Sequence, residues 1–234
     1  MAFRLIYAKM KLTNLTTGVP DNAKNTKTIT PHFGTTISTC SGCEKPLDTK
    51  QQVKDDLNTI LQISKTQQTA LSTLENAGQG VPDSYLKIQE KYPDQNLLEV
   101  KGSKIAQTAA TRTATYDTLK AQQAELKPVV KRLIKIANQE SDELPIEFIK
   151  DLNQSLKLSA LDYTTLSNFY DAATTAETDF YADHTSADAH ADDLAAPINR
   201  LNQYYSAIYQ QAEIAKVNIN TVTAQAKKVQ KQLD

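Results

Sequence analysis

The chain has 234 residues, with 26 lysines and arginines against 27 aspartates and glutamates, and therefore a formal net charge of −1. This balance excludes the basic surface expected of a protein that binds nucleic acid. Hydrophobic residues make up 40% of the chain, slightly less than in a typical globular domain. No apolar run is long enough to span a bilayer. These values favour one thin, elongated domain.

Residues 1–46 differ in composition from the rest of the chain. They are rich in threonine, asparagine, glycine and proline, and apolar residues such as Ile29, Phe33 and Ile37 stand singly. Such a segment cannot bury enough apolar surface to offset the entropy lost on ordering. We expect residues 1–46 to be disordered or to form a processed leader, and residues 47–234 to form the folded domain.

After residue 48, apolar side chains recur at alternating steps of three and four residues, which predicts α-helices. In chain order, the first expected helix begins at Thr49, and a short second one covers Ser84–Lys91. The third runs over Asp94–Asn138 with a kink at Pro128. The last two carry the apolar stripes Ile149–Phe180 and Leu194–Leu233. Two polar residues, Ser64 and Gln67, interrupt the stripe of the first helix. We expect them to be partly exposed or to contact a partner.

The stripes persist over more than three heptads, and the connections between them are short. This pattern predicts coiled-coil packing with antiparallel neighbours. Forty helical residues correspond to a rod of roughly 60 Å. The predicted fold is therefore all-α, an elongated antiparallel coiled-coil helical bundle of three long helices plus a weaker first helix.

Cys40 and Cys43 frame the only cysteine motif, C-S-G-C. As a structural zinc site it lacks a fourth ligand, even if His32 is the third, and as a redox motif it lacks a surrounding βαβ pattern. Its last three residues match the end of a bacterial lipobox, so Cys43 is a candidate lipid anchor. Residues 26–39 lack the continuous apolar stretch of a lipoprotein leader, and Cys40 stands where leucine is usual. We hypothesise that the natural leader differs from this one.

One cluster carries side chains of the types that bind metals: Asp183, His184, Asp188, His190, Asp192 and Asp193. His184 and Asp188 could share a helical face. However, Thr185 and Asp188 have capping-box spacing, and acids near a helix N-terminus complement its dipole. We interpret the cluster as a solvated connector and expect no metal site or cofactor. No Ser/His/Asp or Cys/His set stands where a nucleophile could be positioned, so no catalytic residue is expected.

Several tyrosines follow the last two stripes. Tyr163, Tyr170 and Tyr205 lie on the apolar stripes, so we expect them in the core with their hydroxyls reaching the rim. Tyr204 and Tyr209 lie off the stripe and are the candidates for a binding surface, because glycan-binding surfaces use such rings for stacking.

The region from about Glu147 to Lys227 contains a series of spaced tyrosines and asparagines: Tyr163, Tyr170, Phe180-Tyr181 before an acidic connector, the segment Ile198–Tyr204, Asn218 and Asn220. Together with the lipobox-like end at Cys43, this region resembles the YkyA-type cell-wall-binding lipoproteins of Gram-positive bacteria.

The resemblance implies a non-enzymatic surface lipoprotein with a signal peptide, anchored through Cys43 to the outer face of the cell membrane. Its implied partner is peptidoglycan or another surface protein. The alternative is a coiled-coil interaction or oligomerisation protein, such as a helical toxin or a scaffold subunit. A wall hydrolase would need an acid and a base in a cleft, which a narrow rod does not offer.

Overall fold

A computed structural model describes residues 48–76, 84–185 and 191–234, which all belong to one compact unit, Glu44–Asp234. Helices account for 85% of the described residues, and no strand occurs among them. The predicted all-α fold is confirmed. The predictions for residues 1–46, including those for Cys40 and Cys43, fall outside the described residues.

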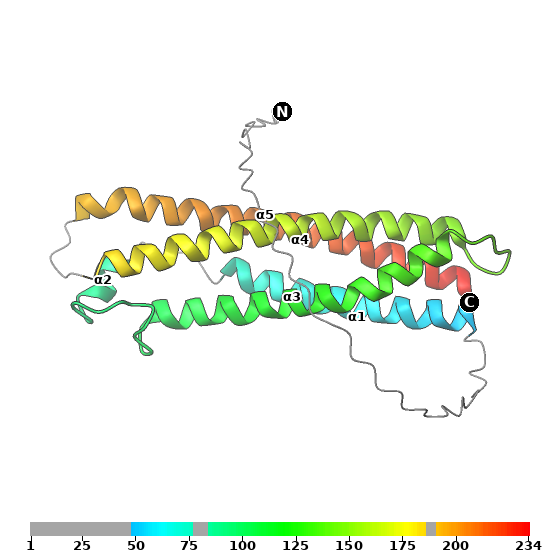
Figure 1. Cartoon of the computed structure of the whole chain (residues 1–234), viewed down its shortest axis with the longest axis horizontal. Coiled ribbons are helices and arrows are strands. Elements are labelled where there is room, and N and C mark those ends of the chain that lie inside the picture. The colour runs from blue at the N-terminus through cyan, green and yellow to red at the C-terminus, as the bar shows by residue number, and fades with distance from the viewer. Residues whose placement is uncertain (1–47, 77–83, 186–190) are drawn as a thin grey trace, which may run out of the picture. The chain divides into compact units, whose positions relative to one another are not determined.

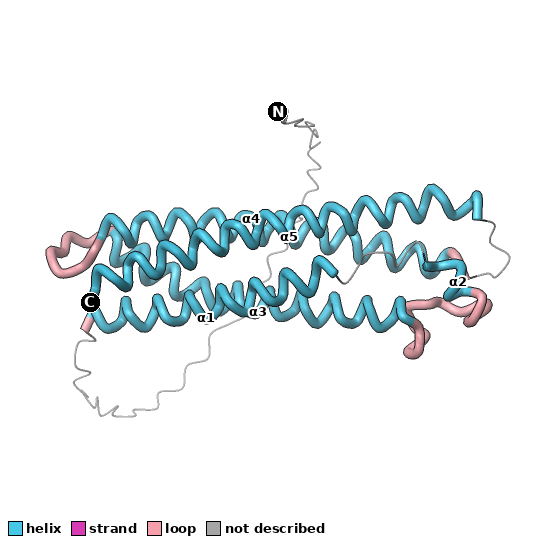
Figure 2. The backbone as a smooth tube through the Cα atoms, turned by 180° about the vertical axis from the view of Figure 1, so that it is seen from behind, coloured by secondary structure: helices cyan, strands magenta, loops and turns pink. Residues whose placement is uncertain are grey.

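Among the described residues, four long helices and one short helix form this unit (Figure 1). They are α1 (Thr49–Asn76), α2 (Tyr85–Gln89), α3 (Lys104–Ala137), α4 (Ile146–Asp183) and α5 (Ala191–Leu233). The long helices pack in a ring in which α1 contacts α3 and α5, and α4 contacts α3 and α5. Each runs antiparallel to both of its neighbours, as Figures 1 and 2 show. The architecture is an up-down-up-down four-helix bundle.

The core follows the predicted apolar stripes. Along α5, every predicted stripe residue from Leu194 to Leu233 is buried except Ile198, which is half-buried. The 43 residues of α5 correspond to roughly 65 Å of helix, close to the predicted rod length. α3 continues through Pro128, and Figure 1 shows the helix bending in its second half, as expected where a proline removes one backbone hydrogen bond.

The prediction that Ser64 and Gln67 are partly exposed is wrong. Their exposed fractions are 3% and 2%. Both residues occupy positions of the stripe itself, and α1 lies between α3 and α5, so the stripe is covered at these polar positions too. The first helix is thus an integral member of the bundle rather than a loosely attached one.

The third helix begins ten residues later than predicted, at Lys104 rather than Asp94. Asp94 has a positive φ of 57°, which is incompatible with a right-handed helix. Ser103 is the N-cap residue: its hydroxyl accepts a hydrogen bond from the Ala106 amide at 3.0 Å and donates one to the Leu97 carbonyl at 2.7 Å. Leu97 is buried although it is not helical, so tertiary packing shapes this segment.

The short helix α2 lies at one end of the bundle and holds the end of α4 (Figure 1). Tyr85 is fully buried, and its ring packs edge-on against Phe180 with the centroids 5.0 Å apart. The Tyr85 hydroxyl donates to the His184 carbonyl, and Gln89 Nε2 donates to the Thr185 carbonyl at 2.5 Å. α2 therefore satisfies carbonyl groups that the end of α4 leaves unpaired.

Candidate functional site: the groove between α4 and α5

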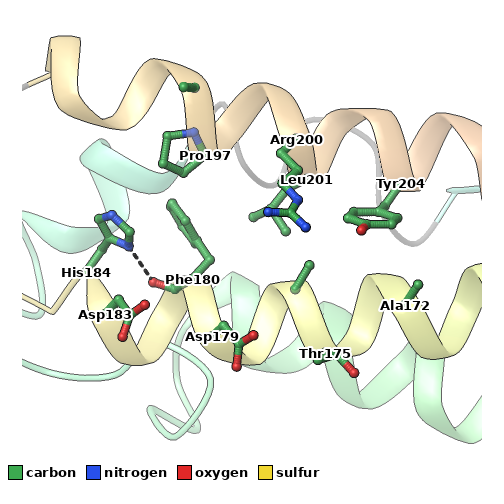
Figure 3. A pocket seen from close by; sticks show the side chains of 12 residues that line it. Ala172, Thr175, Asp179, Phe180, Asp183, His184, Pro197, Arg200, Leu201 and Tyr204 are labelled. Carbon is green, nitrogen blue, oxygen red and sulfur yellow. Dashed lines mark hydrogen bonds between the residues drawn. The ribbon is translucent and has the colours of Figure 1, made fainter. Parts of the chain in front are cut away.

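A groove of about 670 Å³ lies between the C-terminal part of α4 and the N-terminal part of α5 (Figure 3). We call it the α4–α5 groove. Its apolar lining consists of Ala172, Ala176, Phe180, Ala196, Pro197 and Leu201. Its polar lining consists of Thr175, Asp179, Asp183, His184, Arg200 and Tyr204. The rod expected from the sequence thus carries a surface groove at one end.

Helical periodicity explains why these side chains converge. Phe180 and Leu201 are stripe residues, 5% and 2% exposed, and they form the floor of the groove. Asp179 and Asp183 are four residues apart on α4, and Arg200 and Tyr204 are four residues apart on α5, so each pair lies on one helical face. The groove therefore has an acidic wall from α4 and a basic, aromatic wall from α5 (Figure 3).

The charges of the two walls are not neutralised by each other. Asp179, Asp183 and Arg200 are all exposed. Within the described ranges, none of these three side chains takes part in an ion pair. The groove thus presents two carboxylates and one guanidinium to solvent above an apolar floor.

His184 forms the end wall of the groove. Its Nδ1–H donates to the Phe180 carbonyl at 2.8 Å, and its ring stacks on the Phe180 ring with the centroids 4.7 Å apart (Figure 3). Its backbone amide also donates to the Phe180 carbonyl, at 3.1 Å. These contacts give His184 a structural role at the C-terminus of α4.

The structure tests the predicted cluster of potential metal ligands only in part. Asp188 and His190 lie outside the described residues, as does the side chain of Asp192. In the part of the chain that is described, no three His, Cys, Asp or Glu side chains gather as a group that could hold a metal ion.

The two tyrosines predicted as surface candidates have different surroundings. Tyr204 is half-buried and lines the α4–α5 groove. Tyr209 is 41% exposed and is not part of the groove lining. The structure thus associates only Tyr204 with other potential binding residues.

The three tyrosines on the apolar stripes pack in the core as predicted, but two details differ: how far Tyr163 is buried, and where the hydroxyl of Tyr205 points. Tyr170 and Tyr205 are buried, whereas Tyr163 is half-buried. The hydroxyl of Tyr205 does not reach the rim, because it donates to Glu177 Oε1 at 2.5 Å inside the bundle. The buried carboxylate of Glu177 holds this hydroxyl in the core.

Arg112 completes a buried polar cluster with Glu177 and Tyr205. Burial lowers the pKa of Arg112, but its interactions with Tyr205 and Glu177 outweigh this effect and raise the pKa above its usual value. Burial, followed by the charge of Glu177, raises the pKa of Tyr205. The arginine stays charged and the phenol stays neutral. The sequence contained one signal for this cluster: Arg112 and Glu177 are charged residues that stand on the apolar stripes of two helices.

None of the described helices contains an apolar stretch of the length and hydropathy needed to cross a bilayer. No family model matches the chain, and searches of curated proteins and solved structures found no match to it. Function is therefore inferred from the geometry of the groove together with the resemblance described above.

Proposed function

We propose that this protein is a non-enzymatic surface lipoprotein that binds the bacterial cell wall through the α4–α5 groove. The observation that supports the proposal is the position of Tyr204 in an apolar-floored groove with charged walls. Ligand sites commonly combine an apolar lining with a few polar groups that orient the ligand. A tyrosine ring offers such a site both an apolar face and a polar hydroxyl.

The position of the groove along the bundle suits a tethered protein. The chain enters α1 at the same end at which α5 finishes, since Lys54 Nζ pairs with Asp234 Oδ1 at 3.2 Å. The groove is formed where α4 ends and α5 begins, and these helix ends lie at the end of the bundle opposite the C-terminus (Figure 1). A lipid anchor at Cys43 would join the bundle six residues before Thr49. The long helices would then carry the groove several tens of ångströms towards the wall.

Co-sedimentation of the full chain with purified peptidoglycan tests wall binding. The protein should pellet with the wall material and release no soluble fragments from it. Tyr204→Ala should weaken binding about tenfold, whereas Tyr209→Ala, a change of an exposed tyrosine on the same helix, should have no effect. Failure to pellet, or equal losses in the two variants, would contradict the proposed site. Release of fragments would contradict a purely binding role.

Membrane anchoring needs a separate experiment. In cells that produce the full chain, the protein should fractionate with the membrane and be accessible to protease from outside. Cys43→Ala should shift it to the soluble fraction, whereas Cys40→Ala should leave it in the membrane. Equal distribution of both variants would contradict anchoring through Cys43.

A second candidate function is assembly with further copies of the chain. Among the residues that the structure describes, four large apolar side chains are half or more exposed: Leu158 and Leu161 on α4, and Ile214 and Val217 on α5. The hydrogen bond from Asn218 Nδ2 to Asp162 Oδ2, at 2.5 Å, shows that these parts of α4 and α5 lie side by side. A contiguous exposed apolar patch marks a protein contact, and these four side chains are the candidates for one. An oligomer in light scattering that Leu161→Lys dissociates, without binding to peptidoglycan, would favour this function.

A further inference from the structure

We infer that the α4–α5 groove recognises the peptide part of the wall, through a segment that carries both a free amine and a free carboxylate. Arg200 would take the carboxylate, and Asp179 with Asp183 would take the amine. This inference rests on the proposed function and specifies its ligand.

Charge complementarity is the first argument. Arg200 stands on α5, and Asp179 and Asp183 stand on α4, so positive and negative charge occupy opposite walls of the groove. Packed helix axes are about 8–10 Å apart, which a few peptide residues span. A neutral sugar chain leaves charges of both signs unmatched. A zwitterionic peptide segment pairs with both walls at once.

The donor geometry of each wall suits its proposed group. A guanidinium binds a carboxylate through two parallel N–H···O hydrogen bonds. Asp179 and Asp183 are one helical turn apart, about 6 Å along the axis, so an ammonium group lying between them can donate to both. Neither wall needs to break an ion pair first, since no such pair joins these residues to others in the described part of the chain.

The floor of the groove indicates the side chains of the ligand. Between the charged walls lie Ala176, Phe180 and Leu201, which form an apolar floor. Methyl side chains fit such a floor, and Tyr204 can cover the backbone of the peptide. The stem peptides of peptidoglycan have this chemistry, because they are short, rich in alanine and charged at both an amine and a carboxylate.

Calorimetric titration of the full chain tests the inference. The probe is a synthetic stem pentapeptide with an acetylated N-terminus, one free lysine amine and a free carboxyl terminus. Three comparison ligands are the same peptide as a C-terminal amide, the same peptide with its lysine acetylated, and an oligomer of N-acetylglucosamine. The free peptide should bind, each modified peptide should bind about tenfold more weakly, and the sugar oligomer should not bind.

Variants assign each charge to its wall. In Arg200→Gln the free acid and the amide should bind equally weakly, and in Asp179→Asn/Asp183→Asn the free and the acetylated amine should bind equally weakly. Lys228→Gln and Asp171→Asn change exposed charges outside the groove lining on the same helices. They should preserve the discrimination between ligands.

The inference and the proposed function can fail separately. If intact peptidoglycan pellets the protein in a Tyr204-dependent way but the pentapeptide does not bind, the inference is overturned and wall binding stands. Pentapeptide binding that is indifferent to amidation, acetylation and Arg200→Gln also overturns the inference. If neither intact wall nor pentapeptide binds, both proposals fall.

Discussion

Arg112 of α3 and Glu177 of α4 form an ion pair inside the bundle, where each side chain is only 5% exposed. Tyr205 of α5 completes the cluster: its hydroxyl donates to Glu177, and the Arg112 guanidinium carbon lies 4.9 Å from its ring centroid. These groups meet only if α3, α4 and α5 are aligned at one level. We expect the cluster to specify the relative alignment of these helices, because mismatched pairings would bury unpaired charge.

Removing one charge of this pair should strongly destabilise the bundle. Arg112→Met leaves the Glu177 carboxylate buried without its partner, which should lower the free energy of unfolding by about 3–5 kcal/mol. The double change Arg112→Met/Glu177→Leu should recover much of that loss, since no charge is then left buried. Urea unfolding followed by circular dichroism measures both values.

An exposed ion pair provides the control for this prediction. Lys150 and Glu147 are one helical turn apart on α4, with side chains 48% and 81% exposed. Lys150→Met should change the free energy of unfolding by less than about 0.5 kcal/mol, because solvent screens such pairs. If Arg112→Met has an equally small effect, the buried pair does not stabilise the fold in the way described.

The start of α3 gives a second prediction. Ser103 is 1% exposed, and its hydroxyl both caps the helix at Ala106 and donates to the Leu97 carbonyl. Ser103→Ala removes both bonds and should lower the free energy of unfolding by about 1–2 kcal/mol. The exposed mid-helix change Ser206→Ala should be neutral or slightly stabilising, since alanine favours helix. Thermal unfolding of the two variants distinguishes these outcomes.

Periodicity predicted the fold well because it reports directly on burial. The stripe of α5 reads as core in the sequence and is core in the structure. The same rule placed residues 94–103 in a helix, but these residues precede α3. A hydroxyl cap and the left-handed conformation of Asp94 decide where that helix begins, and a pattern of apolar residues records neither.

The candidate site was only half visible in the sequence. Tyr204 stood out because it lies beside the stripe of α5. The sequence alone could not show that Asp179 and Arg200 line the same groove. Which residues of α4 and α5 face each other depends on how far one helix is shifted along the other. Periodicity gives the inward face of each helix but not its axial position against a neighbour. Ser64 and Gln67 stand on the stripe of α1 and are buried with it although they are polar, because α1 packs against two helices.

Alkaline pH should destabilise the bundle through its tyrosines. Burial raises the pKa of Tyr163 to about 12, with further contributions from Tyr116 and Asp171, whereas the unfolded phenol titrates near 10. The unfolded chain therefore loses this proton first. The stabilisation is complete below about pH 10 and is lost as the pH rises towards about 12.

Tyr163→Phe tests the sign of this effect. Phenylalanine cannot ionise, so the free energy of unfolding of the variant should fall less steeply than that of the wild type between about pH 10 and about pH 11. Tyrosinate absorbance should show one fewer late-titrating phenol in the folded variant. Parallel curves for the two proteins in this range would contradict the raised pKa of Tyr163.

The contact between Tyr85 and His184 predicts that α2 supports the groove from behind. The Tyr85 hydroxyl donates to the carbonyl of His184, the residue that forms the end wall of the groove. Tyr85→Phe keeps the buried ring but removes the hydrogen bond, so the global free energy of unfolding should fall by only about 1 kcal/mol. The local effect should be larger, because the last turn of α4 loses a restraint. Hydrogen exchange should accelerate at the amides of Tyr181 and His184, and binding to peptidoglycan should weaken severalfold. Tyr209→Phe should change neither quantity, and unchanged exchange in Tyr85→Phe would show that the groove holds its shape without α2.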